Sequence, residues 1–278
     1  MLRDDAPSPP SHQRADGRAD LVLAPAPGGS AWLRHLYQAA PLRWLFPDAD
    51  PGEPKAGALV NVAGGLAGGD RVATTLGLEA GARFVATTPA AEKVYRSLGA
   101  GTEIACGLRV EDDACCEWLP QETILFDGAR LRRRFDIALA PGARLLAAEM
   151  LVLGRAAHGE AFARGVLMDR WRVARGGRLA WADALRLDDP AAARDARFVL
   201  SGAGAVATLL LAAPDAAAHR DRARELAAGA ASLVAPGLLV ARWAGEAGAV
   251  RAAIGGAVTV LRADALGHPA RLPRLWRT

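Results

Sequence analysis

The chain has few of the residues that form covalent links or hold metal ions. Its three cysteines, Cys106, Cys115 and Cys116, are an odd number with no C-x-x-C pair. Cys115 and Cys116 are adjacent, so in a strand their side chains would point to opposite faces and would make neither a disulfide nor a chelate. The five histidines are too scattered for a sequence-local zinc or nickel cage. We therefore expect reduced, partly buried thiols and no tightly bound cofactor.

Long hydrophobic runs are also absent. None approaches the roughly 20 apolar residues that span a bilayer, so we expect no membrane association. Residues 1–20 are polar and proline-rich without the apolar centre of a signal peptide, which predicts a disordered N-terminal tail. Residues 21–278 are long enough to form one large domain. The sequence is interpreted as that of a soluble, cytoplasmic protein.

Lysine is scarce, because Lys55 and Lys93 are the only two and every other one of the 34 basic residues is arginine; against 30 acidic residues they give a formal net charge of +4. A basic surface favours acidic protein partners. Nucleic-acid binding is a weaker alternative, because no zinc-finger spacing, helix-turn-helix pattern or aromatic RNA-binding motif accompanies the arginines. The run Arg132-Arg133-Arg134 is typical of a solvated strand edge that resists aggregation, with a binding patch as the second interpretation.

Short apolar runs separated by turn residues predict an all-β portion over residues 21–190. Two of the turns lead into similar Ala-Arg-apolar starts, at Ala82 and Ala143, which is a faint echo of repetition. The expected strands are 58–62, 71–78, 83–88, 103–110, 115–119, 131–139, 144–153, 165–173 and 179–187.

The pattern changes in residues 191–278. Strands are predicted over 198–211 and 238–243, and polar-apolar helices over 215–228 and 246–261. This β-α-β-α order suggests two helices packed on part of the sheet. The predicted fold class is mostly β, with stacked or superhelical sheets of many short strands and about two helices in the C-terminal third.

The densest glycine cluster runs from Gly64 to Asp70 (GGLAGGD). It is not a P-loop, because no Gly-Lys-Ser/Thr follows, and not a dinucleotide fingerprint, because a β-patterned run follows instead of a helix. The glycines predict a tight loop with positive φ angles between strands. Asp70 is then either the side chain of an Asx turn or a functional carboxylate.

Two acids stand in the middle of otherwise apolar strand faces. Glu149 alternates with apolar residues in 144–153, and Asp183 does so in 179–187. A dry, unpaired carboxylate costs roughly several kcal/mol, so each acid must pair with arginine, take up a proton, or face water or a cation. A salt bridge to one of the many arginines and an acid lining a wet passage for a metal ion both remain open.

Other candidate residues carry weaker patterns. His158 and Glu160 offer a base and an acid in a turn-like segment, which leaves a hydrolase as an alternative, but no G-x-S-x-G nucleophile motif accompanies them. Seven tryptophans against two tyrosines suggest core and interface anchors. Among them, Trp243 and Trp276 are predicted to contact a partner.

Read in order, several segments resemble the urease accessory protein UreD (UreH) family. The resemblance covers about Leu33 to Thr278 and rests on five motifs in the same order with similar spacing. They are GGLAGGDRV from Gly64, TTPAAEKVYRS from Thr87, EWLPQETILFDG from Glu117, LGRAAHGE from Leu153, and the turn and strand of 175–183.

The resemblance implies a β-rich accessory protein with two helices and no catalysis of its own. Such a protein binds a second accessory protein, UreF, and through it the GTPase UreG. The assembly docks on apo-urease and delivers nickel to its active site, and within that complex the chain is a candidate dimer. A pure protein–protein adaptor without a nickel path is the alternative.

By motif position, Asp70, Glu149 and Asp183 match acids implicated in a water-filled route for nickel in this family. Thr88 and Glu160 are expected beside that route. Spaced single acids attract a divalent cation without chelating it, so Ni²⁺ can leave as well as enter. The resemblance therefore implies transient nickel at these acids and no resident metal.

Overall fold

The computed structural model describes residues 14–27 and 31–277. The tail predicted over residues 1–20 lies mostly outside the described residues, and its boundary at residue 20 is wrong. Strand β1 (Asp16–Pro25) already begins inside that segment, because Ala19, Leu21 and Leu23 alternate into the core and are fully buried.

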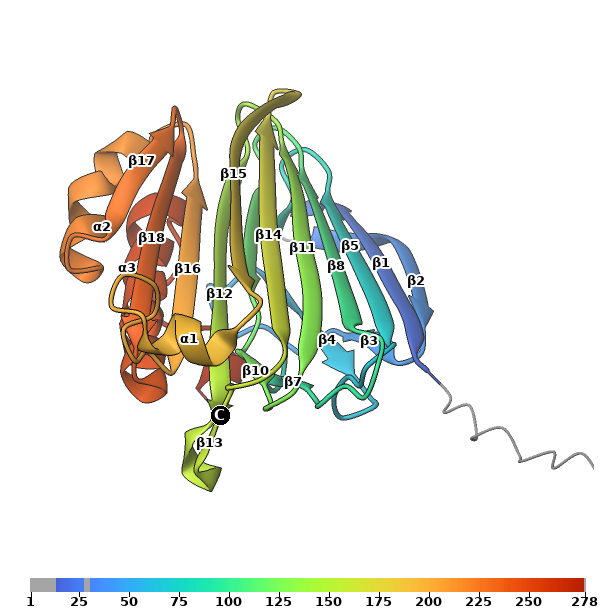
Figure 1. Ribbon diagram of the computed structural model, residues 1–278. Coiled ribbons are helices and arrows are strands. Elements are labelled where there is room, and N and C mark those ends of the chain that lie inside the picture. The colour runs from blue at the N-terminus through green and yellow to red at the C-terminus, as the bar shows by residue number, and fades with distance from the viewer. Residues whose placement is uncertain (1–13, 28–30, 278) are drawn as a thin grey trace, which may run out of the picture.

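The strands form two sheets that face each other (Figure 1). Sheet A consists of β1, β2 (Ala31–Ala39), β5 (Arg71–Leu78), β8 (Thr102–Val110), β11 (Arg130–Leu139), β14 (Val166–Arg175) and β15 (Arg178–Leu187). Sheet B consists of β3 (Leu42–Leu45), β4 (Lys55–Asn61), β6 (Arg83–Thr87), β9 (Cys115–Leu119), β12 (Arg144–Arg155), β16 (Ala205–Ala212), β17 (Ala231–Ala235) and β18 (Leu238–Gly245). The short strands β7 (Glu92–Val94), β10 (Thr123–Leu125) and β13 (Glu160–Ala161) attach to sheet B.

The two sheets are wound as stacked coils, because the chain alternates between them from β4 to β14. Each coil adds one parallel strand to sheet A, in the order β5-β8-β11-β14, and one to sheet B, in the order β4-β6-β9-β12. The amides of Ala82, Ala114 and Ala143 each close an equivalent corner by donating to the carbonyl three residues earlier. Two of these corners, at Ala82 and Ala143, are the similar turns noted in the sequence. The predicted fold class, mostly β with stacked sheets, is confirmed.

Three layers result from this winding. One core lies between the sheets, where Phe135 stacks on Trp171 with ring centroids 4.4 Å apart. The second core lies between the other face of sheet B and helices α2 (Arg220–Leu226) and α3 (Ala247–Leu266). Cys116 faces the first core and Cys115 the second, so the prediction of opposite faces is confirmed, whereas the thiols are more deeply buried than expected. Burial raises the pKa of both thiols.

Helix α3 has clear sequence signals at both ends. Glu246 caps its N-terminus by accepting from the amides of Gly248 and Ala249 at 2.9 and 2.8 Å, and Gly267 ends it at a φ of 66°. The helix expected over 215–228 is a 3₁₀ turn (Ala216–His219) followed by α2. None of the helices in the described ranges has the length and apolarity required to cross a membrane.

The strand predicted over 198–211 is wrong in its first half. Strand β16 begins only at Ala205, and the preceding residues form a loop after the short helix α1 (Pro190–Asp195), which the sequence reading missed. Ser201 and Gly202 have φ angles of 49° and 82°, which turn the chain out of an extended conformation. The apolar Phe198 is therefore 93% exposed instead of lying in a strand.

Candidate functional site

The buried carboxylate of Glu149 lies between the two sheets. Glu149 projects from β12 of sheet B and is 5% exposed. Its carboxylate accepts a hydrogen bond from Trp118 Nε1 at 2.8 Å and a second from Arg133 Nη1, also at 2.8 Å. The sequence left open a salt bridge to arginine and an acid lining a wet passage. In the structure Glu149 forms the salt bridge.

Arg133 reaches this carboxylate from β11 of the opposite sheet. It is 4% exposed, and its guanidinium also binds Asp169 of β14 through two hydrogen bonds of 2.9 and 3.0 Å. The reading of Arg132-Arg133-Arg134 as a solvated strand edge is wrong, because β11 is an interior strand between β8 and β14. Alternation along the strand sends Arg132 and Arg134 to the outer face and Arg133 into the core.

We call this cluster the interlayer site, formed by Trp118, Thr123, Arg133, Glu149 and Asp169. Thr123 Oγ1 accepts a further hydrogen bond from Arg133 at 3.2 Å. The single guanidinium faces two carboxylates, so the fully ionised site carries one unbalanced negative charge. Burial raises the pKa of Glu149 to about 7, although Arg133 and Trp118 favour its ionised form. A proton or a cation would neutralise the site.

Of the interlayer site, the sequence predicted only Glu149, and it missed the other two charged members, Arg133 and Asp169, as well as Trp118 and Thr123. The signal that identified Glu149 also exists for the other two charged members. Arg133 sits among apolar residues at every second position of β11, and Asp169 does so in β14. Charged residues in the buried alternating faces of β11 and β14 on sheet A and of β12 on sheet B mark candidates for pairing, although the alternation does not say which residue meets which.

Asp70 ends the glycine loop, and within the described part of the chain its carboxylate binds only backbone amides. Its Oδ1 accepts from the amide of Ala15 at 2.9 Å, and its Oδ2 accepts from the amide of Ala67 at 2.7 Å. Gly64 and Gly69 adopt φ angles of 74° and 94°, which confirms the predicted tight loop. The carboxylate thus fixes the loop and the start of β1. Its partners are the amides of Ala67, three residues earlier, and of distant Ala15, so the predicted Asx turn is wrong although the role of Asp70 here is structural.

Asp183 lies on β15, at one edge of sheet A, and is not fully buried. Its side chain is 32% exposed, and Oδ2 lies 2.6 Å from Arg242 Nη2 of β18. This ion pair joins an edge of sheet A to sheet B. Neither Asp70 nor Asp183 hydrogen-bonds to the interlayer site among the described residues, so the three predicted acids do not form one cluster.

The two residues expected beside the route also have partners within the chain. Thr88 Oγ1 accepts from the amide of Gln121 at 2.8 Å and donates to the carbonyl of Ala90 at 3.0 Å. Glu160 is held by Arg155 through hydrogen bonds of 3.0 and 2.6 Å, and this partner holds the pKa of Glu160 below its usual value. A carboxylate engaged in this way is a poor general acid for the hydrolase alternative.

The two tryptophans predicted to contact a partner differ in exposure. Trp276 is 8% exposed, and its indole N–H donates to the carbonyl of Leu119 at 2.8 Å, so it is a core residue and the prediction of a surface contact is wrong. Its burial follows from the C-terminal segment folding back against β9. Trp243 is half-buried beside α2, where its N–H donates to the carbonyl of Leu226 at 3.3 Å.

A second buried ionic cluster fastens the C-terminal segment to sheet B. The fully buried Arg262 of α3 donates to Glu117 of β9 and to Glu53. His268 Nδ1 lies 2.6 Å from Glu117 Oε1, and its Nε2 lies 4.0 Å from Cys115 Sγ. Within residues 14–27 and 31–277, no three acidic, histidine or cysteine side chains converge on a metal position.

Comparison with known proteins gives one consistent result. The family model described as UreD urease accessory protein matches residues 15–277. A urease accessory protein UreD of Granulibacter bethesdensis is 52% identical over 84% of this chain and 99% of its own length. One of Methylobacterium sp. (strain 4-46) is 47% identical over the full length of both chains, and one of Azorhizobium caulinodans is 43% identical over 96% of this chain and 98% of its own.

Proposed function

The chain belongs to the UreD family of urease accessory proteins, and from this membership we propose that it is a cytoplasmic scaffold for the delivery of nickel to urease. In this proposal it binds UreF, and through UreF the GTPase UreG, and docks on apo-urease. It performs no catalysis itself. Nickel passes the buried acids of the sandwich as cargo and is not retained.

The observation that supports a path for the cation is the charge of the interlayer site. Glu149 and Asp169 share one guanidinium, so the ionised site is short of one positive charge in a buried environment. A divalent cation near these oxygens would more than supply that missing charge and would leave the site with one excess positive charge, which also favours its release. It would also compete with the proton that burial otherwise favours on Glu149.

The composition of the interlayer site suits passage better than storage. Carboxylate oxygens are hard ligands, and at this site Arg133 already binds both acids, so a passing Ni²⁺ would find few open coordination positions. Cys115 and His268 would bind nickel more strongly, but their side chains lie beside Glu117 in the other core. The cation would therefore be attracted without being trapped.

The pure adaptor remains the second candidate. It is favoured by the absence of contact between the three predicted acids and by the internal partners of Asp70 and Asp183. A scaffold needs only a stable fold and partner surfaces. The two proposals differ in one respect, because only the nickel path requires the charge of Glu149.

The experiment uses a cell with a complete urease operon in which this gene is replaced by a variant. Glu149→Gln preserves the size of the side chain but removes its charge, and Glu225→Gln on the exposed helix α2 is the matched control. Nickel per urease, urease activity, the level of the variant protein and its co-purification with UreF are measured together. We expect Glu149→Gln to lower nickel per urease at least fivefold with protein level and complex intact.

The alternative outcomes separate the two proposals. Full nickel loading by Glu149→Gln at a normal protein level would remove the path and leave the adaptor. Loss of the protein itself would point to folding, and a Glu149→Asp variant then tests whether a shorter carboxylate restores nickel loading. A defect in the Glu225→Gln control would show that charge loss anywhere on the protein is harmful and would count against the path.

A further inference from the structure

The outer face of sheet A is the one broad sheet surface without a covering layer in the described part of the chain. The inner face of sheet A packs on sheet B, and the far face of sheet B packs on α2 and α3. In Figure 1 the strands β14, β11, β8, β5 and β1 lie side by side with their outer face open. A face left open in a layered molecule is accessible to another protein.

This outer face is strongly basic. Its five central strands carry eight arginines against four acidic residues, a surplus as large as the net charge of +4 of the whole chain. The arginines are Arg18, Arg71, Arg109, Arg130, Arg132, Arg134, Arg170 and Arg172, and the acids are Asp16, Asp20, Glu103 and Asp136.

Some of these positive charges are placed side by side. Arg134 of β11 and Arg170 of β14 are direct cross-strand partners in the parallel register, and Arg132 lies two residues along on the same face. Like charges directly opposite each other destabilise a sheet. Within the described residues, Arg132 and Arg170 have no ion pair, whereas Arg134 has only a loose one to Asp136 at 3.6 Å.

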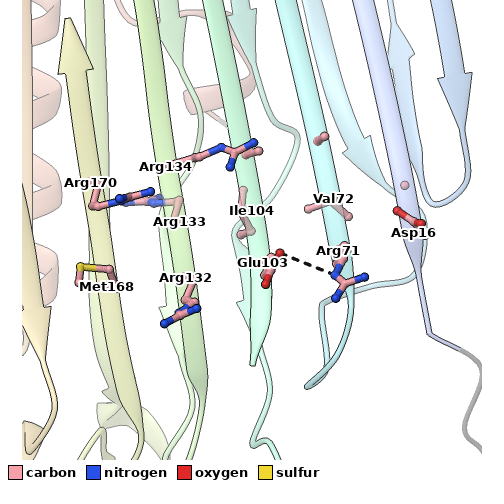
Figure 2. A pocket seen from close by; sticks show the side chains of 13 residues that line it. Asp16, Arg71, Val72, Glu103, Ile104, Arg132, Arg133, Arg134, Met168 and Arg170 are labelled. Atoms are coloured by element: carbon pink, nitrogen blue, oxygen red, sulfur yellow. Dashed lines mark ion pairs between the residues drawn. The ribbon is translucent and has the colours of Figure 1, made fainter. Parts of the chain in front are cut away.

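The arginines border a hollow whose floor is made of small side chains. A depression of about 470 Å³ is lined by Arg132, Arg134, Arg170 and Arg71, with Ala73 and Ala105 among the residues between them. Figure 2 shows Arg132, Arg134 and Arg170 on one side of the depression and Arg71 on the other, with an ion pair between Glu103 and Arg71. The shape admits a protruding segment of a partner.

A second hollow of about 630 Å³ continues the first along the same strands. Its floor includes Gly77 and Gly107, and Arg109 and Arg172 line it. Because both hollows follow β5, β8 and β11, they form one shallow trough along the strand direction. A trough of this kind fits an extended or ridge-like part of a protein surface better than a small molecule.

We propose that this trough, the outer face of β1, β5, β8, β11 and β14, docks an acidic surface segment of a partner protein. The like-charged pair Arg134 and Arg170, with Arg132 beside it, supplies the attraction for carboxylates. Glu103 and Asp136 supply complementary positions for basic groups of the same partner and so favour one orientation. The inference rests on the proposed scaffold function and specifies the chemistry of one of its partner surfaces.

Nucleic acid fits the trough less well. No aromatic side chain projects from the outer face of these five strands, and the exposed Tyr37 beside Arg18 belongs to the edge strand β2, so bases would have no stacking platform within the trough itself. The four acids scattered among the arginines would repel a continuous phosphate backbone. We therefore treat nucleic-acid binding as an outcome that the test must distinguish.

The test uses the full-length protein and a double variant, Arg134→Glu with Arg170→Glu. The matched control is Arg220→Glu with Arg222→Glu, which makes the same charge change on the exposed start of α2. Two fluorescein-labelled probes are used, a glutamate-rich peptide of twelve residues and a single-stranded DNA of the same charge. Their binding is measured by fluorescence anisotropy at low and at physiological salt. Thermal unfolding establishes that each variant is folded. If the trough variant does not fold, the charge-neutralising pair Arg134→Gln with Arg170→Gln replaces it.

We expect the trough variant to bind the acidic peptide about tenfold more weakly than the unmodified protein, with the α2 control within about twofold of it. The trough variant should also fail to activate urease in cells at a normal protein level, whereas the control should succeed. Equal peptide binding by both variants, or tighter binding of DNA than of peptide, would overturn the proposal.

The scaffold function can fail separately. If deletion of the gene leaves urease active, the scaffold function is wrong, and the peptide titration alone decides whether the trough binds acidic segments. If deletion abolishes activity but the trough variant activates urease normally, the scaffold function stands and the docking proposal is wrong.

Discussion

Arg133 and Glu149 join the two sheets of the sandwich through a buried ion pair of 2.8 Å. Arg133 comes from an interior strand of sheet A and Glu149 from an interior strand of sheet B, so the pair crosses the main core. Removing one partner of such a pair leaves a charge uncompensated in a poorly solvated place. The pair therefore provides the most direct test of what the interlayer site contributes to folding.

Arg133→Met should strongly destabilise the protein. The substitution leaves Glu149 and Asp169 without their shared counterion, at a cost of about 3–5 kcal/mol in the free energy of unfolding. Urea denaturation followed by fluorescence measures this loss. Arg134→Met, one residue away on the solvent-facing side of β11, should change it by less than about 0.5 kcal/mol. Similar losses in both variants would contradict the buried placement of Arg133.

Glu149 should make the stability depend on pH. Burial raises its pKa from 4.5 to about 7, so the folded state binds its proton more tightly than the unfolded state. Its stabilising contribution is present below about pH 4.5 and is lost as pH rises toward 7, an effect on the order of 3 kcal/mol at most. The difference in unfolding free energy between the unmodified protein and Glu149→Gln should therefore fall over this interval.

Glu160→Gln provides the control of opposite sign. Arg155 lowers the pKa of Glu160, so this acid contributes stability above its unfolded pKa and loses it as the solution is acidified. The difference in unfolding free energy between the unmodified protein and Glu160→Gln should rise with pH. If the difference in unfolding free energy between the unmodified protein and Glu149→Gln also rises with pH, the ion pair with Arg133, and not burial, sets the pKa of Glu149.

Asp70→Asn should destabilise the glycine loop even though it preserves the shape of the side chain. Both carboxylate oxygens of Asp70 accept backbone amides, and asparagine offers one oxygen where two are needed. The unsatisfied amide should cost about 1–3 kcal/mol in thermal or urea unfolding. The exposed Asp113→Asn is the control, because its φ of 57° suits asparagine. An unchanged Asp70→Asn would indicate that the loop does not depend on this carboxylate.

Arg262→Met should loosen the C-terminal segment. Arg262 is fully buried and donates to Glu117, Glu53 and the carbonyl of Arg271, so it fixes the end of the chain against sheet B. Amide hydrogen exchange in residues 268–277 should speed up by about tenfold or more, whereas Arg274→Met, which is exposed, should leave it unchanged. Identical exchange in the two variants would show that the segment is held by other contacts.

Much of the fold could be predicted, because alternating apolar patterns and glycine turns are local signals. The longer strands from Arg71 to Leu187 and helix α3 follow such patterns closely, whereas β1, β3 and the short strands β7, β10 and β13 were not predicted. The edge strands β2 and β17 were missed because their residues are largely exposed and lack the alternation of a half-buried strand. The loop before β16 was misjudged because its apolar residues suggested a strand that Ser201 and Gly202 interrupt.

The site was less predictable for a physical reason. Register along one strand identified Glu149 as a buried acid, but it could not identify a partner on the other sheet. Pairing between Arg133 and Glu149 depends on how the coils stack, which is a property of the whole winding. Register also indicated Asp183, whereas Asp70 rests on its place in the glycine loop and on motif position. The backbone partners of Asp70 and the edge partner of Asp183 are visible only in three dimensions.

The role in urease maturation is tested most directly by urease activity in cells that carry the complete urease operon with this gene deleted and then restored. Urease protein and its nickel content are measured alongside activity. We expect urease protein to persist after deletion, with its activity and nickel content lost, and both to return when the gene is restored. Undiminished activity and nickel content after deletion would contradict a role of this chain in urease maturation.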